Sequence, residues 1–450
     1  MFNSASIILP TSSIYFFSGG FQANFNKNRI CRFCTAVHKD ISTLNYHNIP
    51  ADISLMDDNL YKTFQEVGIV KGCVLNKLES FSAALQLPPC TLHDTAEGVL
   101  AYDVYSILQE IVIKKRLCTL DALNYTIKNL RFPGDKPNPI TITKNRVRLG
   151  GSGGQISALM RCLPLALRLV LKNKAGAFAK TTLYEMLMRL LNVFYMESAP
   201  ELSQTEISDL SIITNEYLNA RCDYAEFPKI KPKHHFMSHH PGAFRAMGPL
   251  VGLSTIRFES KHKVLKAIAV KGRNFINVSQ TMAVRHQRAM SHSLYNGLYP
   301  QEVVCSHDIT PIRESRLTLD ERDCIRAKLK DDFGHITSSL TVRGTKYSAG
   351  AFVPLHKSRD EGTMTVGKII CAVTKGPNLA YEQSFLLCTA YEAYDSGWGY
   401  FSVEKRKETI AVHFSELADF HPLLEVNIAD DKSLLKGVPI VILHHYVRDS

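Results

Sequence analysis

Apolar residues recur with helical spacing through the middle of the chain. Between Val99 and Ile111 they follow a period of about 3.6 residues, which is typical of one buried helix face. The same pattern predicts helices over 98–115, 154–173 and 179–196, the second interrupted near Pro164. Ser203 and Glu206 have the spacing of a capping box and predict the start of a further helix. We interpret these stripes as core and not as cofactor sites.

The pattern changes after about Pro300 to short runs in which apolar and polar residues alternate, as in half-buried strands. The predicted strands lie within Ser339–Tyr347, Gly350–Pro354, Thr365–Val373, Ser384–Cys388, Thr409–Phe414 and Pro439–Tyr446. The densely charged stretch Glu314–Asp332 predicts a solvated helix or connector. We therefore expect an α+β protein with four regions, over 1–50, 51–299, 300–335 (a charged connector) and 336–450 (a β-rich module).

Composition indicates an ordinary globular chain. Of its 450 residues, 45% are hydrophobic and 21% are charged, which is enough to build proper cores. The 11 cysteines are an odd number without a framework spacing, so we expect reduced thiols in an intracellular compartment. Pro10 interrupts the apolar N-terminus and no long apolar run follows, so we expect neither a signal peptide nor a membrane span.

Positive charge is concentrated in one segment, Lys229–His292. The chain has 53 Lys and Arg against 42 Asp and Glu, a net charge of +11. That segment holds twelve basic residues and one acid, Glu259, so the rest of the chain is balanced. A local positive field attracts polyanions such as the DNA backbone. The alternative is a solvated basic face without a ligand.

Three short motifs have the spacing of metal ligands, namely Cys31-x-x-Cys34, Cys90-x-x-His93 and His235-x-x-x-His239. Two thiolates two residues apart can chelate one zinc ion, and imidazoles four residues apart share one helix face. Each motif alone is a weak signal and also fits an inert core cysteine or a buried or surface histidine. Cys90 and His93 together with His235 and His239 would complete one zinc site. Nearby partners for Cys31 and Cys34 are His38 and His47.

Glu259 stands in the middle of the basic segment. Ser260 after it suits a helix N-cap, which would place the carboxylate at the mouth of an amphipathic helix. There it could hold a divalent ion against phosphate oxygens, or simply cap the helix. The glycine-rich stretch Leu149–Gln155 lacks the phosphate-loop pattern and predicts a loop before a helix.

Five strings together resemble transposase-like proteins of animal genomes related to the En/Spm (CACTA) group. They are Pro88–Val99, Lys231–Phe236, Gly248–Leu250, Arg257–His262 and Arg273–Val278. The resemblance runs from about Phe21 to about Gln287. It implies a DDE-type transposase, in which an RNase H-like core with a large helical insertion, here within 51–299, holds two Mg²⁺ ions on two Asp and one Glu.

Carried over residue by residue, the resemblance makes Glu259 the third catalytic acid. It makes Cys90 and His93, with His235 and His239, zinc ligands. In the family the two Asp lie upstream of the position that matches Cys31, and this chain has no acid before Asp40. We therefore expect an N-terminally truncated, inactive remnant.

The expected partner of such a remnant is DNA in the nucleus, and a homo-oligomer is left open. The cations expected to contact DNA are Lys231, Lys233, Arg257, Lys261, Lys263, Lys266, Lys271, Arg273 and Arg285. Two alternatives remain at this point. One is a domesticated nucleic-acid-binding or scaffolding protein, and the other is a divergent metal-dependent nuclease that uses Asp94, Glu97 and Glu259.

Overall fold

The computed structural model describes most of residues 73–447, together with Cys31, Phe33, Cys34, Ala36 and Ile41. The gaps after residue 73 are 80, 82, 132–133, 135, 274–275, 297–301, 307, 331–333, 359–361, 376–380, 429–434 and 436–438. The chain forms two compact units. The helical unit is Met1–Asn129 with Gly134–Lys261, and the sheet unit is Leu130–Pro133 with His262–Ser450. The α+β class is thus confirmed, while the units divide at Lys261, earlier than the change in composition near Pro300.

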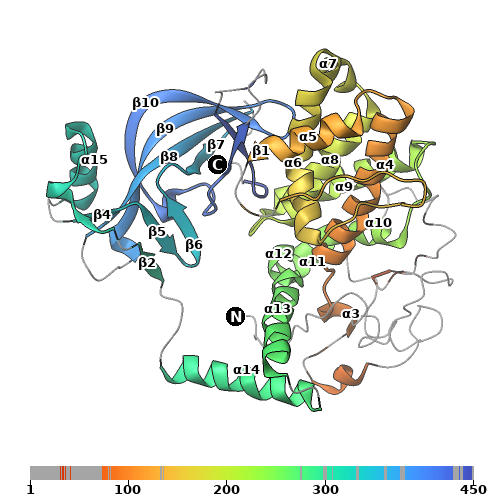
Figure 1. The fold of residues 1–450 in the computed structure, drawn as a ribbon, viewed down its shortest axis with the longest axis horizontal. Coiled ribbons are helices and arrows are strands. Elements are labelled where there is room, and N and C mark those ends of the chain that lie inside the picture. The colour runs from red at the N-terminus through yellow and green to blue at the C-terminus, as the bar shows by residue number, and fades with distance from the viewer. Residues whose placement is uncertain are drawn as a thin grey trace. The chain divides into compact units, whose positions relative to one another are not determined.

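The described part of the helical unit contains helices and no strand (Figure 1). Its elements are η3 (Val74–Lys77), α3 (Ala83–Gln86), η4 (Leu92–Leu100), α4 (Ala101–Leu108), η5 (Gln109–Lys114), α5 (Leu120–Asn129), α6 (Gly153–Leu171), η6 (Lys172–Lys174), α7 (Ala175–Phe178), α8 (Thr182–Glu197), α9 (Gln204–Asp223), α10 (Pro232–Met237), α11 (His240–Met247) and α12 (Leu250–Leu253). The helices predicted from apolar periodicity are all present. Contrary to expectation, α6 continues through Pro164, although proline removes one backbone hydrogen bond from the helix.

Side-chain caps define where two of these helices begin. Ser203 and Glu206 form the predicted capping box at the start of α9. Ser152 caps α6 in the same way, so the glycine-rich stretch is a loop leading into a helix. A methyl group added at Gly153 would lie 2.2 Å from Leu92 Cδ1. Glycine at this position therefore lets α6 approach η4 closely.

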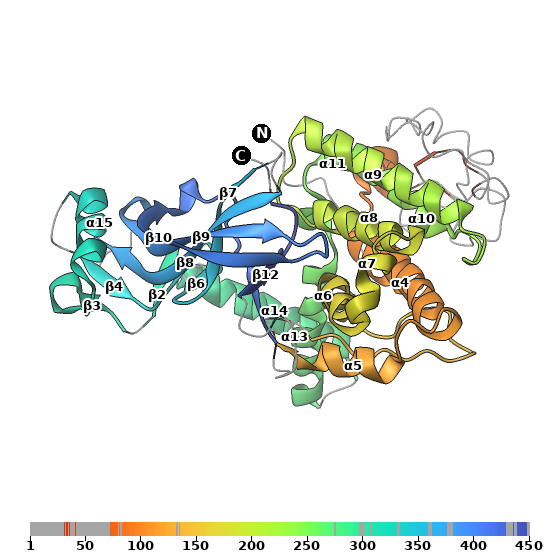
Figure 2. The same ribbon diagram turned by 90° about the horizontal axis from the view of Figure 1, so that it is seen from above.

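Buried leucines of α6 and α8 form the core of the helical unit, and α8 packs beside α9 (Figure 2). By length and composition alone, the stretch Gly153–Phe178 could cross a membrane. In the structure, 67% of its most apolar window is buried inside the protein, as in a core helix.

The sheet unit contains all of the described strands. Its elements are β1 (Leu130–Arg131), α14 (Val278–Tyr295), β2 (Val303–Cys305), β3 (Thr310–Pro311), η7 (Ile312–Glu314), α15 (Leu319–Leu329), β4 (His335–Thr337), β5 (Ser339–Val342), β6 (Thr345–Ser348), β7 (Phe352–Lys357), β8 (Thr363–Thr374), η8 (Tyr381–Gln383), β9 (Ser384–Asp395), β10 (Phe401–His413), η9 (Phe414–Glu416), β11 (Leu424–Ile428) and β12 (Ile440–Ile442). Helix α13 (Ile256–Gly272) spans the boundary between the units. It begins four residues before Ser260, so the predicted cap at Ser260 is wrong. The Ser254 hydroxyl instead accepts a hydrogen bond from the backbone N–H of Ile256.

The strands form an antiparallel half-barrel whose order is β1-β11-β12-β10-β9-β8-β4-β3, with β7 also paired to β8 (Figure 1). A second, three-stranded sheet has the order β2-β5-β6. Alternating residues of the long strands serve different cores, as the pleat requires. Phe385 and Leu387 of β9 pack against α15, whereas Leu386 and Cys388 face the core that includes the small sheet.

Candidate metal centre

Four histidines of α10 and α11 are completely buried, namely His234, His235, His239 and His240. Pro232 is at the start of α10, where its missing N–H is tolerated, and the chain turns at Ser238 and His239 before α11. The sequence His-His-Phe-Met-Ser-His-His therefore directs four imidazoles into the interior of the helical unit. Buried imidazoles need polar partners, and the partners divide the four rings into three groups.

The first group joins His235 and His239 to Cys31 and Cys34. The Nε2 atoms of the two histidines lie 3.2 Å apart, and Cys34 Sγ lies 3.2 Å from His235 Nε2. One ligand atom from each of the four residues lies within 4.8 Å of all the others. These two half-motifs, about 200 residues apart, thus form one Cys₂His₂ cluster.

The cluster has the dimensions of a tetrahedral zinc site. Zinc bonds of about 2.0 Å to nitrogen and about 2.3 Å to sulfur place neighbouring ligand atoms roughly 3.3–3.8 Å apart. The observed separations of 3.2 Å for the described pairs are close to that range. All four side chains are at least nine-tenths buried, so no bulk water competes for the ligand atoms. The residues present therefore fit a divalent metal ion.

The two thiols have opposite protonation tendencies. Hydrogen bonding from Cys31 lowers the pKa of the Cys34 thiol far below its usual value, and His235 and His239 lower it further. Burial raises the pKa of the Cys31 thiol. Burial also lowers the pKa of His239, which favours the neutral imidazole that binds metals. These shifts favour one thiolate in the cysteine pair and a neutral imidazole, the forms that bind metal ions.

Phe33 holds the Cys-x-x-Cys turn against the helices. Its ring packs edge-on against Phe236 of α10, with centroids 6.4 Å apart, and lies 5.4 Å from the His239 ring. Only 1% of Phe33 is exposed. The turn is thus part of the same hydrophobic core as α10 and α11.

Cys90 and His93 do not join this cluster, so the predicted combination with His235 and His239 is corrected. Cys90 Sγ lies 3.2 Å from His93 Nδ1, and both atoms contact the hydroxyl of Thr255, at 3.0 Å and 3.2 Å. Burial opposes ionisation of Cys90, but the hydrogen bonds of His93 and Thr255 outweigh it and lower the pKa of the thiol. Sequence spacing could not distinguish between the two Cys-containing half-motifs.

His234 belongs to the second group, which is built around Asp103 of α4. His234 Nδ1 accepts a hydrogen bond from the Lys231 backbone, so its Nε2–H donates to Asp103 Oδ2, at 2.9 Å. Arg221 Nε donates to the same oxygen at 2.7 Å, and the Tyr217 hydroxyl also donates to it. This network ties α10 to α4 and α9 directly beside His235, a candidate metal ligand.

His240 belongs to the third group, with Glu197 at the end of α8. His240 Nδ1 lies 2.6 Å from Glu197 Oε1, and the Thr95 hydroxyl donates to Glu197 Oε2. Neither Asp103 nor Glu197 is among the residues identified from the sequence. The only signal in the sequence was an acidic residue within an otherwise apolar helix stripe. A buried acid of this kind requires a polar or charged partner.

The acids considered for catalysis have structural roles where they are described. Asp94 is buried and its Oδ2 accepts the Cys90 backbone N–H at 3.3 Å. Glu97 Oε1 accepts the backbone N–H of Gly153 at 3.0 Å, at the N-terminus of α6. Glu259 is in α13, but its side chain lies outside the described residues, as do those of Arg257 and Lys263. His38 and His47 also lie outside them.

The expected DNA-contacting cations fall into two sets. Lys231 and Lys233 are half-buried in the helical unit, where Lys231 Nζ lies over the Tyr102 ring and Lys233 Nζ donates to the His93 carbonyl. These contacts give both lysines a structural role. In contrast, α13, α14 and the residues between them display exposed cations, namely Lys261, Lys266, Lys271, Arg273, Arg285 and Arg288. None of these six forms an ion pair with a described acid.

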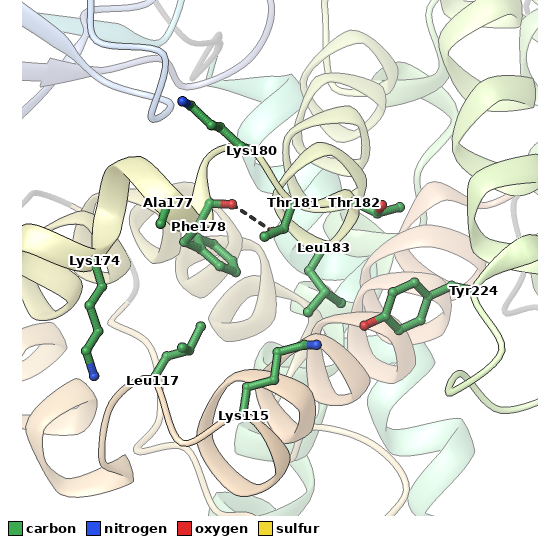
Figure 3. A pocket seen from close by; sticks show the side chains of 10 residues that line it. All are labelled: Lys115, Leu117, Lys174, Ala177, Phe178, Lys180, Thr181, Thr182, Leu183 and Tyr224. Atoms are coloured by element: carbon green, nitrogen blue, oxygen red, sulfur yellow. Dashed lines mark hydrogen bonds between the residues drawn. The ribbon is translucent and has the colours of Figure 1, made fainter.

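A separate cavity of about 460 Å³ lies in the helical unit beside the start of α8. Three lysines line it, Lys115, Lys174 and Lys180, together with the rings of Phe178 and Tyr224 (Figure 3). It shares no residue with the Cys₂His₂ cluster.

Comparison with known proteins finds no matching family model, curated protein or solved structure.

Proposed function

We propose that this chain is a transposon-derived DNA-binding protein without strand-transfer activity, whose helical unit is held together by zinc. On this proposal the helices of 73–261 descend from the helical insertion of an RNase H-like transposase core. DNA is the partner and the nucleus is the compartment. The observation that carries the proposal is the set of exposed cations on α13, α14 and their connection, none of which forms an ion pair with a described acid.

The composition of α14 supports a polyanionic partner. The helix has 18 residues and no described side chain of it is buried. It contains Arg285 and Arg288, two histidines (His286 and His292) and no acid, since no Asp or Glu occurs between Ser260 and Gln301. A helix with such a surface gains nothing from internal ion pairs, whereas phosphate groups would neutralise it.

A salt titration of DNA affinity tests this proposal. The unaltered chain should bind duplex DNA with a logarithmic salt slope of about −0.9 per phosphate contacted. The triple variant Lys266→Ala/Lys271→Ala/Arg285→Ala should bind more weakly and lose up to about three units of that slope. The matched control Lys128→Ala/Lys136→Ala/Lys346→Ala removes the same charge from exposed positions elsewhere and should retain the slope. Equal behaviour of the two triple variants would refute the role of α13 and α14.

The zinc ion is proposed at Cys31, Cys34, His235 and His239. Two thiolates and two neutral imidazoles are a set that zinc prefers, and the ion would join the turn at residues 31–34 to α10 and α11. Replacing zinc with Co²⁺ should give the intense sulfur-to-cobalt absorption of a thiolate site. Cys34→Ser should weaken that absorption strongly, whereas Cys90→Ser should leave it unchanged. The opposite result would return the site to Cys90 and His93.

The absence of strand transfer is proposed because the carboxylates of Asp94 and Glu97 already accept hydrogen bonds from backbone N–H groups of the helical unit. A Mg²⁺ or Mn²⁺-dependent DNA cleavage assay tests it. Cleavage that disappears in Glu259→Ala would overturn this part of the proposal and would support the divergent nuclease.

A further inference from the structure

The sheet unit contains a second group of metal-ligating side chains that the sequence patterns did not single out. It consists of Asp419, His421 and His445. One ligand atom from each residue lies within 4.8 Å of the other two. This group contains no sulfur, so its chemistry differs from that of the Cys₂His₂ cluster.

The topology of the half-barrel explains why these residues meet. Strands β11 and β12 are antiparallel, and Leu424 is opposite Ile442 in their register. Continuing that register beyond the last pair places His421 opposite His445. Asp419 is held beside His421 because its Oδ1 accepts the backbone N–H of His421, at 2.6 Å. Two segments that leave one end of a ladder therefore bring all three side chains together.

The geometry within the group is close and partly shielded. His445 Nε2 lies 2.6 Å from Asp419 Oδ2, and His421 Nδ1 lies 3.3 Å from Asp419 Oδ1. The rings of His421 and His445 are perpendicular, with centroids 4.7 Å apart. Asp419 and His445 are buried, whereas 34% of the His421 side chain is exposed. The group thus has a buried base and one partly exposed side.

Neighbouring contacts keep both segments in place. The backbone N–H groups of Ala418 and Leu423 donate to β7, at the carbonyls of Pro354 and Phe352. On the other segment, Lys357 Nζ donates to the Val447 carbonyl at 3.0 Å. A site supported on both sides in this way loses little freedom when a ligand binds.

We propose that Asp419, His421 and His445 bind one first-row divalent transition-metal ion, with the remaining coordination position open to water or another oxygen ligand. Two imidazoles and one carboxylate suit zinc and its neighbours, and they are poor ligands for Ca²⁺ or Mg²⁺, which prefer oxygen atoms. The ion would clamp the segment before β11 to the segment after β12. Because the site lacks thiolates, it should bind more weakly than the Cys₂His₂ cluster.

The test is a Co²⁺ titration of the metal-stripped full chain, with absorption spectra and equilibrium dialysis to count bound ions. We expect two ions per chain, one with sulfur-to-cobalt absorption and one with only the weaker d–d bands of nitrogen and oxygen ligands. His421→Ala and Asp419→Asn should each lose the sulfur-free ion and retain the other. The matched control His444→Ala should retain both, because His444 stacks on His421 but is not part of the ligand group.

His421→Ala and Asp419→Asn were chosen so that the loss of metal can be separated from a loss of folding. His421 is half-exposed, and asparagine keeps the oxygen with which residue 419 accepts the backbone N–H of His421, at 2.6 Å. Emission from Trp398, the single tryptophan and a residue of the sheet unit, reports whether each variant keeps its fold. The proposal is overturned if the unaltered chain binds no sulfur-free ion, or if folded His421→Ala and Asp419→Asn still bind it. Loss of the sulfur band alone would count against the zinc centre of the helical unit and leave this site standing.

Discussion

Asp103→Asn is the substitution with the largest expected effect on the helical unit. Asp103 is completely buried, and its Oδ2 accepts hydrogen bonds from Tyr217, Arg221 and His234. Its Oδ1 has no hydrogen-bond partner among the described residues. Asparagine keeps the shape and one accepting oxygen. It removes the charge that balances Arg221, whose guanidinium is only 2% exposed.

The magnitude follows from leaving that guanidinium unpaired. Removing one partner of a buried ion pair destabilises a protein by about 3–5 kcal/mol, because the remaining charge stays buried without compensation. A surface pair provides the control, since Arg189 and Glu185 are 3.8 Å apart and partly exposed. Glu185→Gln should therefore change the free energy of unfolding by less than about 1 kcal/mol.

Two optical signals separate the units in a urea titration. Far-ultraviolet circular dichroism follows mainly the helical unit, whereas Trp398 fluorescence follows the sheet unit. Asp103→Asn should shift the circular dichroism transition to lower urea and leave the Trp398 transition in place. A shift below about 1 kcal/mol, equal to that of Glu185→Gln, would refute the reasoning that the Asp103 charge stabilises α4, α9 and α10.

The pH dependence of the same transition provides a further check on Asp103. Burial opposes ionisation, but His234 and Arg221 outweigh it and hold the pKa of this carboxyl well below its usual range. In the unfolded chain the pKa is about 3.9. The charge therefore contributes its full stability above about pH 4 and loses it as the pH falls further, towards the folded-state value. Asp103→Asn should be less sensitive than the unaltered chain to acid below pH 4.

Three further substitutions test the packing. Gly153→Ala should destabilise the helical unit by about 1–3 kcal/mol through overlap with Leu92, whereas Gly176→Ala, with open space around it, should be neutral or slightly stabilising in the same urea titration. Glu197→Gln should lower the stability of that unit by about 1–3 kcal/mol, since His240 and Thr95 lose a charged acceptor. Leu387→Ala should cost about 2–5 kcal/mol and shift the Trp398 transition alone, and a shift confined to circular dichroism would contradict the assignment of Leu387 to the sheet core.

Helices with one continuous apolar stripe were predictable from the sequence, because burial alone determines that pattern. The strands were predictable only in part. The prediction Ser384–Cys388 covers the start of β9, but this strand continues to Asp395 through Thr389 and Glu392, because its far end is less buried. β11 was missed, since Val426 is the only buried residue of its five and Pro422 lies two residues before it.

The candidate site was predictable as pieces and not as a whole. Spacing identified the His235 and His239 pair and the Cys31 and Cys34 pair, because local geometry decides whether two side chains can share an ion. Which pairs meet depends on how α10 packs against the N-terminal turn, and no local pattern contains that information. The group at Asp419 was missed for the same reason, since it is created by the register of β11 and β12.

The Cys₂His₂ cluster also has a consequence for the order in which the chain acquires structure. Cys34 and His235 are separated by 201 residues. Closing a loop of that length costs roughly 5 kcal/mol of chain entropy, which grows only slowly with loop length. Zinc binding by structural sites supplies about 10–16 kcal/mol, more than enough to close it. During synthesis the two cysteines leave the ribosome long before the two histidines. The metal site could therefore form only after the chain up to His239 has been made, when the helical unit is nearly complete.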